Sequence, residues 1–347
     1  MYEFNVELVS ANFRRSTNRP SGIPLSVVDL MPFRKGDDAS RTMSDTLAVA
    51  RAADAAGYHR YWIAEHHNAA GLASSATVVV MAEVAAATER IRVGAGGIML
   101  PNHAPYVVAE QFGTLAAFHP GRIDLGLGRA PGTDPWTVRA LRRGGAGADD
   151  FPREVAEVRD YLGPARPTQR VRAIPGQGSE VPVFILGSST FGAALAAQEG
   201  LPYVFASHFA PDQLLIALDT YRSHFRPSAV LDKPYAIVAA GAVVAETDEK
   251  ARHLFTSMQR RFLTLVRGKM EFLPPVEDID AIWSKAEREA VGSMLRESHV
   301  GSPATVRKGL AELADRTQVD ELMLMTETWD LEDRIRSHQL LAEAWSA

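Results

Sequence analysis

The sequence predicts an α/β protein in which eight parallel strands close into a (β/α)8 TIM barrel. The chain has 347 residues, of which 46% are hydrophobic and 23% charged, and this is enough for one large barrel with insertions. Short apolar segments alternate with helical patterns from residue 24 onward. We count eight such segments, nearly all followed by a helix, which is the repeat of this barrel.

The expected strands are apolar runs rather than strict alternations, as is typical of parallel strands covered by helices. They span 24–30, 58–65, 91–100, 122–128, 181–187, 201–207, 234–246 and 319–325. Helices are expected over 40–56 with Gly57 after the end, from a cap at Ser74 or Ser75 to Thr88, over 106–118, and from Ser189 to Glu199. A doubly wound sheet is the competing architecture. Eight strands close naturally into a barrel, and nothing in the sequence marks a reversal of strand order.

Two long insertions interrupt this rhythm, at about 130–180 after the fourth strand and at 247–300 after the seventh. Loops of this length in a compact barrel are usually functional or mobile. The second insertion either covers the barrel mouth as a lid or only adds outer helices. Residues 1–23 are expected to form a flexible N-terminal arm, and residues 24–347 a single barrel domain.

The composition limits the classes of function. The sequence contains no cysteine, which excludes disulfides, thiolate nucleophiles and cysteine-ligated metals, and which fits a cytoplasmic location. Lys and Arg total 37 against 42 Asp and Glu, with no basic block, so no nucleic-acid partner is expected. The short clusters Arg142-Arg143 and Arg260-Arg261 are interpreted as solvated helix faces. No apolar run reaches the roughly 18 residues of a membrane span, so no membrane association is expected.

In such a barrel the functional site lies at the carboxyl ends of the strands. The sequence there carries chemically active side chains on several strands. They are Glu65-His66-His67-Asn68, Gly96-Gly97 with Asn102-His103 further on, Gly128-Arg129, Ser188-Ser189, Ser207-His208 and Thr326-Glu327. We therefore expect three histidine-bearing ends, an arginine and two glycine-rich ends to converge on one face.

Ser188 and Ser189 stand between a strand and a helix, where free backbone N–H groups and hydroxyls form an anion site. Arg129 ends the neighbouring strand and could bind a phosphate with its guanidinium group. Each feature alone fits an ordinary helix cap or a surface arginine, but together they favour phosphate binding. Neither a P-loop nor a G-x-G-x-x-G dinucleotide motif is present.

Two further motifs leave alternatives open. Gly94, Gly96 and Gly97 lie in one strand, so a flat aromatic ring approaches the backbone there, or the strand packs closely or bulges. His66 and His67 are adjacent and point to opposite faces unless the strand breaks. A histidine beside Glu65 is a candidate general base, although a lone histidine is more often structural. The spacing predicts no metal site.

Three stretches carry a resemblance to a known family. "AEHHN", "GAGGIMLPNHAPYVVAEQFGTLAAFHPGRIDLGLGRAPGTD" and "ILGSSTFGAALAAQEGLPYVFASHFAPD" closely resemble the luciferase-like flavin-dependent monooxygenases, in particular the subgroup with the GRIDLGLGRAPG signature. The likeness runs from Pro24 onward. It implies a TIM barrel that binds reduced FMN, commonly as a homodimer.

The resemblance also implies roles for individual residues. His66 matches the family's catalytic base, and Arg129 with Ser188 and Ser189 its phosphate site. The family's non-proline cis peptide falls at Gly96-Gly97, beneath the flavin. His67 and Asn68 are then expected to line or brace the pocket. Asn102-His103-Ala104 departs from luciferase, so no role is carried over to His103.

In the family mechanism, reduced flavin reacts with O₂ to give a C4a-(hydro)peroxyflavin, which oxygenates a small organic substrate. A separate flavin reductase is expected to supply reduced FMN, because no nicotinamide motif is visible. Met270, Phe272, Leu273 and Trp283 in the second insertion point to an apolar substrate, unless they only pack the insertion. Light emission is not implied.

Three other hypotheses about the function stay open. The same fold could use the deazaflavin F420 for hydride transfer, with Arg139, Arg142 and Arg143 beside Arg129 as a basic groove for its acidic tail. Glu65, His66 and His208 could serve a metal-dependent hydrolase. The protein could also bind flavin without catalysis.

Overall fold

The structure is a computed structural model that describes residues 22–141, 148–269 and 271–347. Most of the expected N-terminal arm lies outside the described residues, as do Arg142, Arg143 and Met270. None of the helices in the described ranges is long and apolar enough to cross a membrane.

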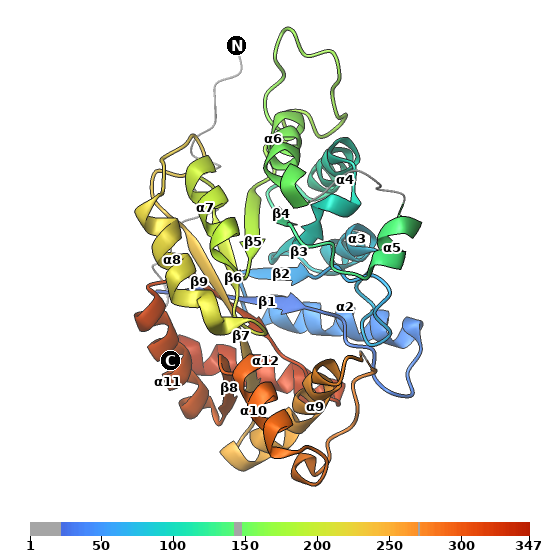
Figure 1. Cartoon of the computed structure of the whole chain (residues 1–347), viewed down its shortest axis with the longest axis vertical. Helices are drawn as coiled ribbons and strands as arrows, with labels where there is room; N and C mark the ends of the chain where they lie inside the picture. Colours follow the sequence, from blue (N-terminus) through green and yellow to red (C-terminus); the bar gives the residue numbers. More distant parts are fainter. Residues whose placement is uncertain (1–21, 142–147, 270) are drawn as a thin grey trace.

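Eight parallel strands form a closed barrel, as the sequence predicted (Figure 1). They are β1 (Leu25–Asp29), β2 (Arg60–Ile63), β3 (Arg92–Met99), β4 (Ile123–Gly128), β5 (Val183–Gly187), β6 (Tyr203–Ala206), β7 (Ala236–Val244) and β9 (Glu321–Met325). The first seven pair in chain order, and β9 pairs with both β7 and β1, which closes the ring. The alternative of a doubly wound sheet is therefore wrong.

A ninth strand, β8 (Ser298–Gly301), was not predicted. It pairs in parallel with the last residues of β7, from Gly241 onward, where the pairing of β7 with β9 ends. Its sequence, SHVG, has no apolar run, so it carries no strand signal of its own. Its hydrogen bonds come from the unusual length of β7 rather than from its own propensity.

Helices surround the barrel (Figure 1). They are α2 (Ala39–Ala55), α3 (Thr77–Ala87), α4 (Pro105–Phe118), α5 (Pro135–Ala140), α6 (Phe151–Leu162), α7 (Thr190–Glu199), α8 (Leu214–Ser223), α9 (Asp248–Val266), α10 (Lys285–Met294), α11 (Pro303–Thr317) and α12 (Leu331–Ser346). Short 3₁₀ turns are η1 (Leu100–Asn102), η2 (Ala148–Asp150), η3 (Pro211–Gln213) and η4 (Ile279–Ala281). The first insertion thus contributes α5 and α6, and the second α9, α10 and β8.

Local signals set some helix ends but not all. Gly57, at a φ of 78°, follows the end of α2 as predicted. The predicted cap of α3 by Ser74 or Ser75 is wrong, because the helix begins at Thr77 and its N-cap Ala76 makes no side-chain cap bond. Ser74 instead belongs to the preceding turn, where its carbonyl accepts the backbone N–H of His66 at 2.9 Å.

Alternate residues of each strand face inward or outward. In β2, for example, Tyr61 and Ile63 pack against the outer helices, while Trp62 belongs to the interior cluster with Phe184 and Met323. The Trp62 and Phe184 rings meet edge to face, with centroids 4.9 Å apart. The interior is therefore a packed core and not a pore.

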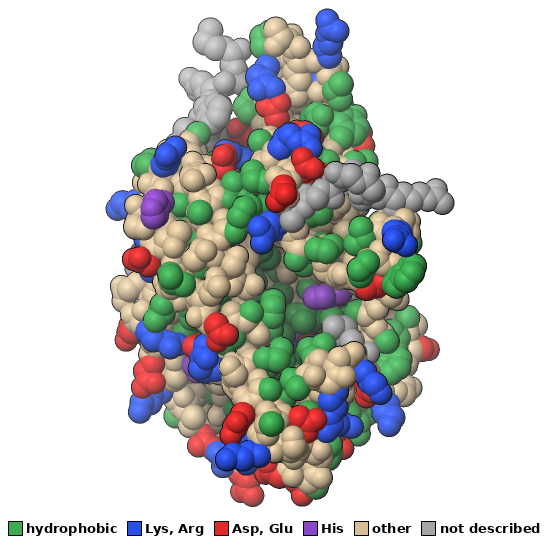
Figure 2. Space-filling model, viewed as in Figure 1, with side chains coloured by type: hydrophobic (Ala, Val, Ile, Leu, Met, Phe, Trp, Pro, Cys, Tyr) green, Lys and Arg blue, Asp and Glu red, His purple; other side chains and the backbone are tan. Residues whose placement is uncertain are grey.

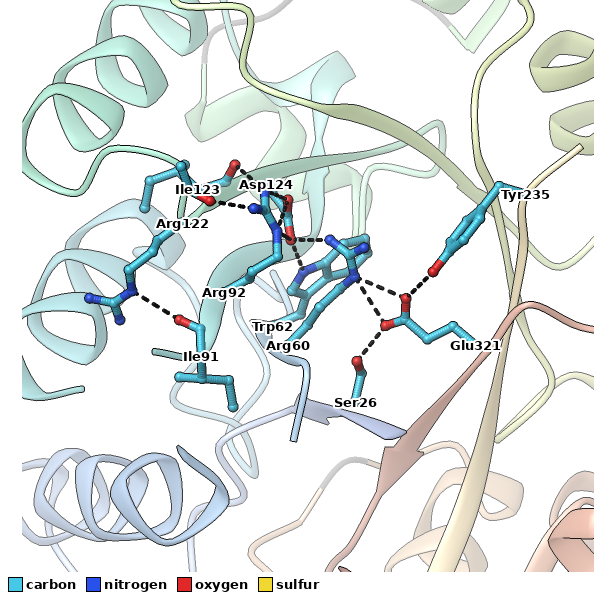
Figure 3. Close-up of polar contacts among 11 residues, drawn as sticks. Ser26, Arg60, Trp62, Ile91, Arg92, Arg122, Ile123, Asp124, Tyr235 and Glu321 are labelled. Carbon is cyan, nitrogen blue, oxygen red and sulfur yellow. Dashed lines mark hydrogen bonds and ion pairs between the residues drawn. The ribbon is translucent and has the colours of Figure 1, made fainter. Parts of the chain in front are cut away.

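A buried polar network lies below this layer, toward the amino ends of the strands (Figure 3). Arg60 lies between two acids, with Nη1 at 2.7 Å from Asp124 and Nε at 3.0 Å from Glu321. Arg92 also pairs with Asp124, and the Tyr235 hydroxyl donates to Glu321 at 2.7 Å. Two arginines and two acids leave the network formally neutral, so a buried net charge is avoided.

Candidate active site at the carboxyl end of the barrel

A cavity of about 380 Å³ opens at the carboxyl ends of the strands. Figure 2 shows this face hollowed near its centre, with largely hydrophobic side chains in and around the hollow. The apolar walls include Val28, Leu30, Leu72, Val204, Phe262, Leu265, Met294, Met323 and Met325. Six of the seven site residues predicted from the sequence line this cavity, and Asn68 does not. The six are His66, Gly96, Gly97, Arg129, Ser188 and Ser189.

One group of polar residues suits a phosphate. Ser189 is the N-cap of α7, yet its side chain makes no cap bond, and the Ser188 hydroxyl forms no hydrogen bond with another described residue. The Arg129 guanidinium lies 4.0 Å from the centroid of the Phe191 ring and forms no ion pair with an acid in the described ranges. The Thr190 amide is bonded to Gln213 Oε1 at 3.3 Å. A free cation, two hydroxyls and a helix N-terminus thus face one end of the cavity.

A second, more buried group contains two histidines and an arginine. His66 and His208 each have a buried Nδ1 atom without a hydrogen-bond partner among the described residues. Arg261, only 2% exposed, comes from α9 and forms an ion pair with the fully buried Glu327. The Nε atom of Arg261 has no partner in the described part of the chain. These three buried nitrogens therefore belong to side chains that line the cavity, and none of them has a hydrogen-bond partner in the described ranges.

Burial sets the protonation states of this group. It lowers the pKa of His66 to about 4, and the nearby positive charge of Arg261 acts in the same direction. Burial lowers the pKa of His208 to about 3. Both imidazoles are therefore neutral at pH 7, and each can donate one proton and accept another. Burial also raises the pKa of Glu327 above its usual value, against the effect of Arg261.

Glu65 forms no hydrogen bond with His66, although the sequence places them side by side, and its charge only partly offsets the lowering of the His66 pKa. Its Oε1 atom lies 2.8 Å from Nε2 of His67 and 2.8 Å from Nε2 of His103. Its Oε2 atom accepts the backbone N–H of Met99 at 3.2 Å. His66 lines the cavity and Glu65 does not, although both lie in the segment just after β2. The proposed hydrolase set of Glu65, His66 and His208 is not brought together.

Comparison with known proteins decides the family. A model of the luciferase-like monooxygenase family matches residues 23–321. The chain is 50% identical to the Bacillus subtilis protein YvbT over 95% of this chain and 99% of that protein. It is 49% identical to an Escherichia coli luciferase-like monooxygenase over 92% of this chain and 96% of that protein. The chain belongs to the luciferase-like monooxygenase family. The resemblance seen in the sequence is confirmed.

Solved structures of family members share the fold. The apo form of MsnO8 superposes with a TM-score of 0.87 at 35% identity, covering 93% of this chain and 98% of that one. More distant structures show the fold alone. They include a type II Baeyer–Villiger monooxygenase in complex with FMN, at a TM-score of 0.70 and 16% identity, and an F420-dependent secondary alcohol dehydrogenase, at 0.63 and 14%.

The cis peptide that the luciferase-like family implies is present between Gly96 and Gly97. The neighbour that leaves no room for a side chain differs between the glycines of this strand. A Cβ atom on Gly94 would lie 2.4 Å from Nε1 of Trp62, and one on Gly97 would lie 2.8 Å from the carbonyl oxygen of Gly126. Close packing inside the barrel therefore requires these two glycines, whether or not a flat ring binds above them.

Asn68 lies in the turn after β2 with a φ of 54°, and its side chain is exposed. Its Nδ2 atom donates to Asp134 at 2.8 Å, and the Thr133 hydroxyl donates to the carbonyl of His67 at 3.0 Å. His67 and Asn68 therefore brace the turn against the loop after β4 and do not line the cavity.

The second insertion of this luciferase-like chain forms one wall of the cavity. Arg261, Phe262 and Leu265 of α9 line it, with Met294 of α10. The interpretation of Arg260-Arg261 as a solvated face is wrong for Arg261. A signal was present in the sequence, because Leu254, Met258, Arg261, Phe262 and Leu265 follow the helical spacing of a buried stripe.

The residues expected to form an apolar lid lie elsewhere. Leu273 is buried against the segment after β1, where its N–H donates to the carbonyl of Phe33 at 2.7 Å. The Phe272 ring meets the Phe33 ring edge to face. Trp283 lines a separate groove of about 770 Å³ between α9 and α10. None of these three side chains lines the cavity, and its apolar wall comes from other residues.

Proposed function

We propose that this protein is a flavin-dependent monooxygenase that binds reduced FMN in the barrel-end cavity and uses O₂ to oxygenate a small apolar substrate. The observation that carries the proposal is the placement of Arg129, Ser188 and Ser189 at one end of an apolar cavity that also contains neutral His66. A phosphate and a flat aromatic ring on one ligand fit this pairing of an anion site with an apolar slot.

The residues present fit FMN. Arg129, the two serine hydroxyls and the N-terminus of α7 would hold the phosphate. Gly96 and Gly97 would enclose the ring system together with the methionines of the cavity wall, which are Met99, Met294, Met323 and Met325. Bound reduced FMN would supply the electrons and the centre that activates O₂.

The chain's own residues prepare the site. His66, neutral because it is buried, lines the cavity, and its imidazole can accept or donate a proton there. The Arg261–Glu327 pair supplies a fixed dipole without net charge. The apolar walls exclude water, which protects a reactive intermediate from hydrolysis. The substrate pocket is accordingly suited to an apolar molecule.

FMN is favoured over F420 by the relatives. The Escherichia coli relative at 49% identity is named a luciferase-like monooxygenase, and a Bacillus subtilis relative at 29% identity an N-acetyl-S-alkylcysteine monooxygenase. The FMN-bound and F420-dependent structures, at 14–17% identity, share the fold alone and favour neither cofactor. Hydride transfer with F420 and flavin binding without catalysis remain as outcomes of the test.

Binding titrations test the cofactor. We expect FMN to bind more tightly than F420. Arg129→Met should weaken FMN binding about 10- to 100-fold, since a hydrogen bond to a charged group contributes about 1.5–3 kcal/mol. Riboflavin, which lacks the phosphate, should be affected less than about twofold. Arg139→Met is the matched control, because Arg139 is exposed and does not line the cavity. Tighter binding of F420, or no flavin binding, would overturn the assignment.

Anaerobic loading with reduced FMN, followed by rapid mixing with oxygenated buffer, tests the reaction. An oxygen-activating enzyme should give a transient flavin absorbance that differs from both the reduced and the oxidised spectra. Direct conversion to oxidised flavin at the rate of free FMN would indicate a flavin carrier. A separate reductase as the source of reduced FMN and a homodimeric assembly belong to the same proposal. Light scattering of the purified protein tests the assembly.

A further inference from the structure

We propose that Glu65, His67 and His103 form a binding site for one divalent transition-metal ion, with Zn²⁺ the best fit. The proposal does not rest on flavin binding, because none of the three residues lines the cavity. It also departs from the sequence, in which neither histidine has a metal-binding spacing. The site is created by the fold, which brings the ends of β2 and β3 together.

The ligand atoms converge. One nitrogen from each of His67 and His103 and one carboxylate oxygen of Glu65 all lie within 4.8 Å of one another. Among the described residues, this is the one group of three such side chains with that spacing. Two imidazoles and a carboxylate are a ligand set that Zn²⁺ uses in proteins, with further positions left for water. Ca²⁺ and Mg²⁺ prefer oxygen ligands, so they fit less well.

The backbone at each ligand is held independently of the side chains. The N–H of His67 donates to the carbonyl of Gly132 at 3.3 Å, and the N–H of His103 donates to the carbonyl of Leu100 at 2.9 Å. The second oxygen of Glu65 is held by the Met99 amide. The ligands are therefore preorganised, and the Met99 amide supports the carboxylate.

Burial gives the site an inner and an outer side. The Glu65 side chain is 1% exposed, whereas those of His67 and His103 are 16% and 30% exposed. An ion can therefore enter from the histidine side and meet a buried negative charge. It would fasten the turn after β2 to the loop after β3. Because His66 and Met99 line the cavity from these two segments, the ion would also steady the cavity rim.

Calorimetric titration of metal-stripped protein with Zn²⁺ alone tests the site. We expect one ion per chain, bound at least about tenfold more weakly by His67→Phe and by His103→Phe, since even outer-shell changes cost 10- to 100-fold. His119→Phe, which removes a histidine outside the cluster, should bind like the unchanged protein. Equal affinity in His103→Phe, or no binding at all, would overturn the proposal. The three residues would then only hold the two segments together by hydrogen bonds.

A measurement on the unchanged protein covers variants that fail to fold. Diethyl pyrocarbonate modifies accessible histidines, and mass spectrometry locates the modified residues. Zn²⁺ should protect His67 and His103 but not His119. The midpoint of thermal unfolding should also rise with Zn²⁺ concentration, as mass action requires for a ligand of the folded state. Equal protection of all three histidines would indicate binding to scattered surface sites and would overturn the proposal.

Discussion

At the scale of single residues, His66 is the member of the adjacent histidine pair that lines the cavity. We expect His66→Asn to slow the reaction of bound reduced FMN with O₂ and substrate about 10²- to 10⁴-fold, the usual contribution of a positioned acid–base group. FMN binding should change little. His224→Asn, at an exposed histidine just after α8, is the control and should leave the rate unchanged.

The pH dependence checks the state of the same residue. Burial lowers the pKa of His66 to about 4, so the neutral form predominates above that pH. The rate that depends on neutral His66 should therefore persist to pH 5 and fall as the pH approaches 4. A midpoint near 6.5, the value of a solvated histidine, would contradict a buried His66.

Two adjacent arginines offer a matched pair on stability. Arg261 and Glu327 are both buried, whereas Arg260 and Glu277 are partly exposed. Arg261→Met should lower the free energy of unfolding by about 3–5 kcal/mol, because it leaves a buried carboxylate without its partner. Arg260→Met should cost less than about 1 kcal/mol. Denaturant unfolding measures both. Equal losses would mean that Arg261 is not buried.

At the scale of elements, β3 is constrained by its neighbours inside the barrel. A Cβ atom on Gly97 would lie 2.8 Å from the carbonyl oxygen of Gly126, and backbone cannot yield as a flexible side chain does. Gly97→Ala should therefore cost about 1–3 kcal/mol of stability. Gly292→Ala is the matched control on α10, where nothing lies within 4 Å of the added atom. That change should stabilise the helix by up to about 1 kcal/mol. Chemical denaturation of the two variants gives the comparison.

The elements also show what local sequence can predict. The barrel strands, most helices and the site residues at strand ends could be predicted, because apolar runs and their carboxyl ends are local signals. β8 could not, because it depends on the length of β7. The pairing of Glu65 with His103 could not either, because it depends on how the segments after β2 and β3 meet. The burial of Arg261 could be predicted only from its position on the apolar stripe of α9, because a pair of arginines is itself typical of a solvated face.

At the scale of the whole molecule, the barrel keeps polar groups in separate layers. The Arg60 network fills the amino end with paired charges, Trp62 and Phe184 form an apolar layer, and His66 and Arg261 lie at the carboxyl end. Three buried nitrogens of this last layer, on His66, His208 and Arg261, lack a hydrogen-bond partner among the described residues. A fold that satisfies its polar groups at one end and leaves them free at the other is organised to bind a ligand there.

Buried histidines also make the stability of the whole molecule depend on pH. Burial lowers the pKa of His59 and His66 to about 4 and that of His208 and His338 to about 3. Below about pH 6.5 the unfolded chain binds protons that the folded chain does not, so the free energy of unfolding falls as the pH falls from 6.5 toward 4. The stability that comes from keeping these histidines neutral is therefore fully present above pH 6.5.

His338 isolates the effect, because it lies on α12 and does not line the cavity. Its ring meets Tyr58 edge to face, and neither of its nitrogens has a hydrogen-bond partner among the described residues. His338→Phe keeps an aromatic ring and removes the titrating group. The slope of unfolding free energy against pH between 6.5 and 4.5 should then decrease by at most about 1.4 kcal/mol per pH unit, the share of one proton. Urea unfolding at several pH values measures the slope, and His224→Phe, at an exposed histidine, should leave it unchanged. An unaltered slope in His338→Phe would show that His338 is protonated as readily in the folded protein as in water.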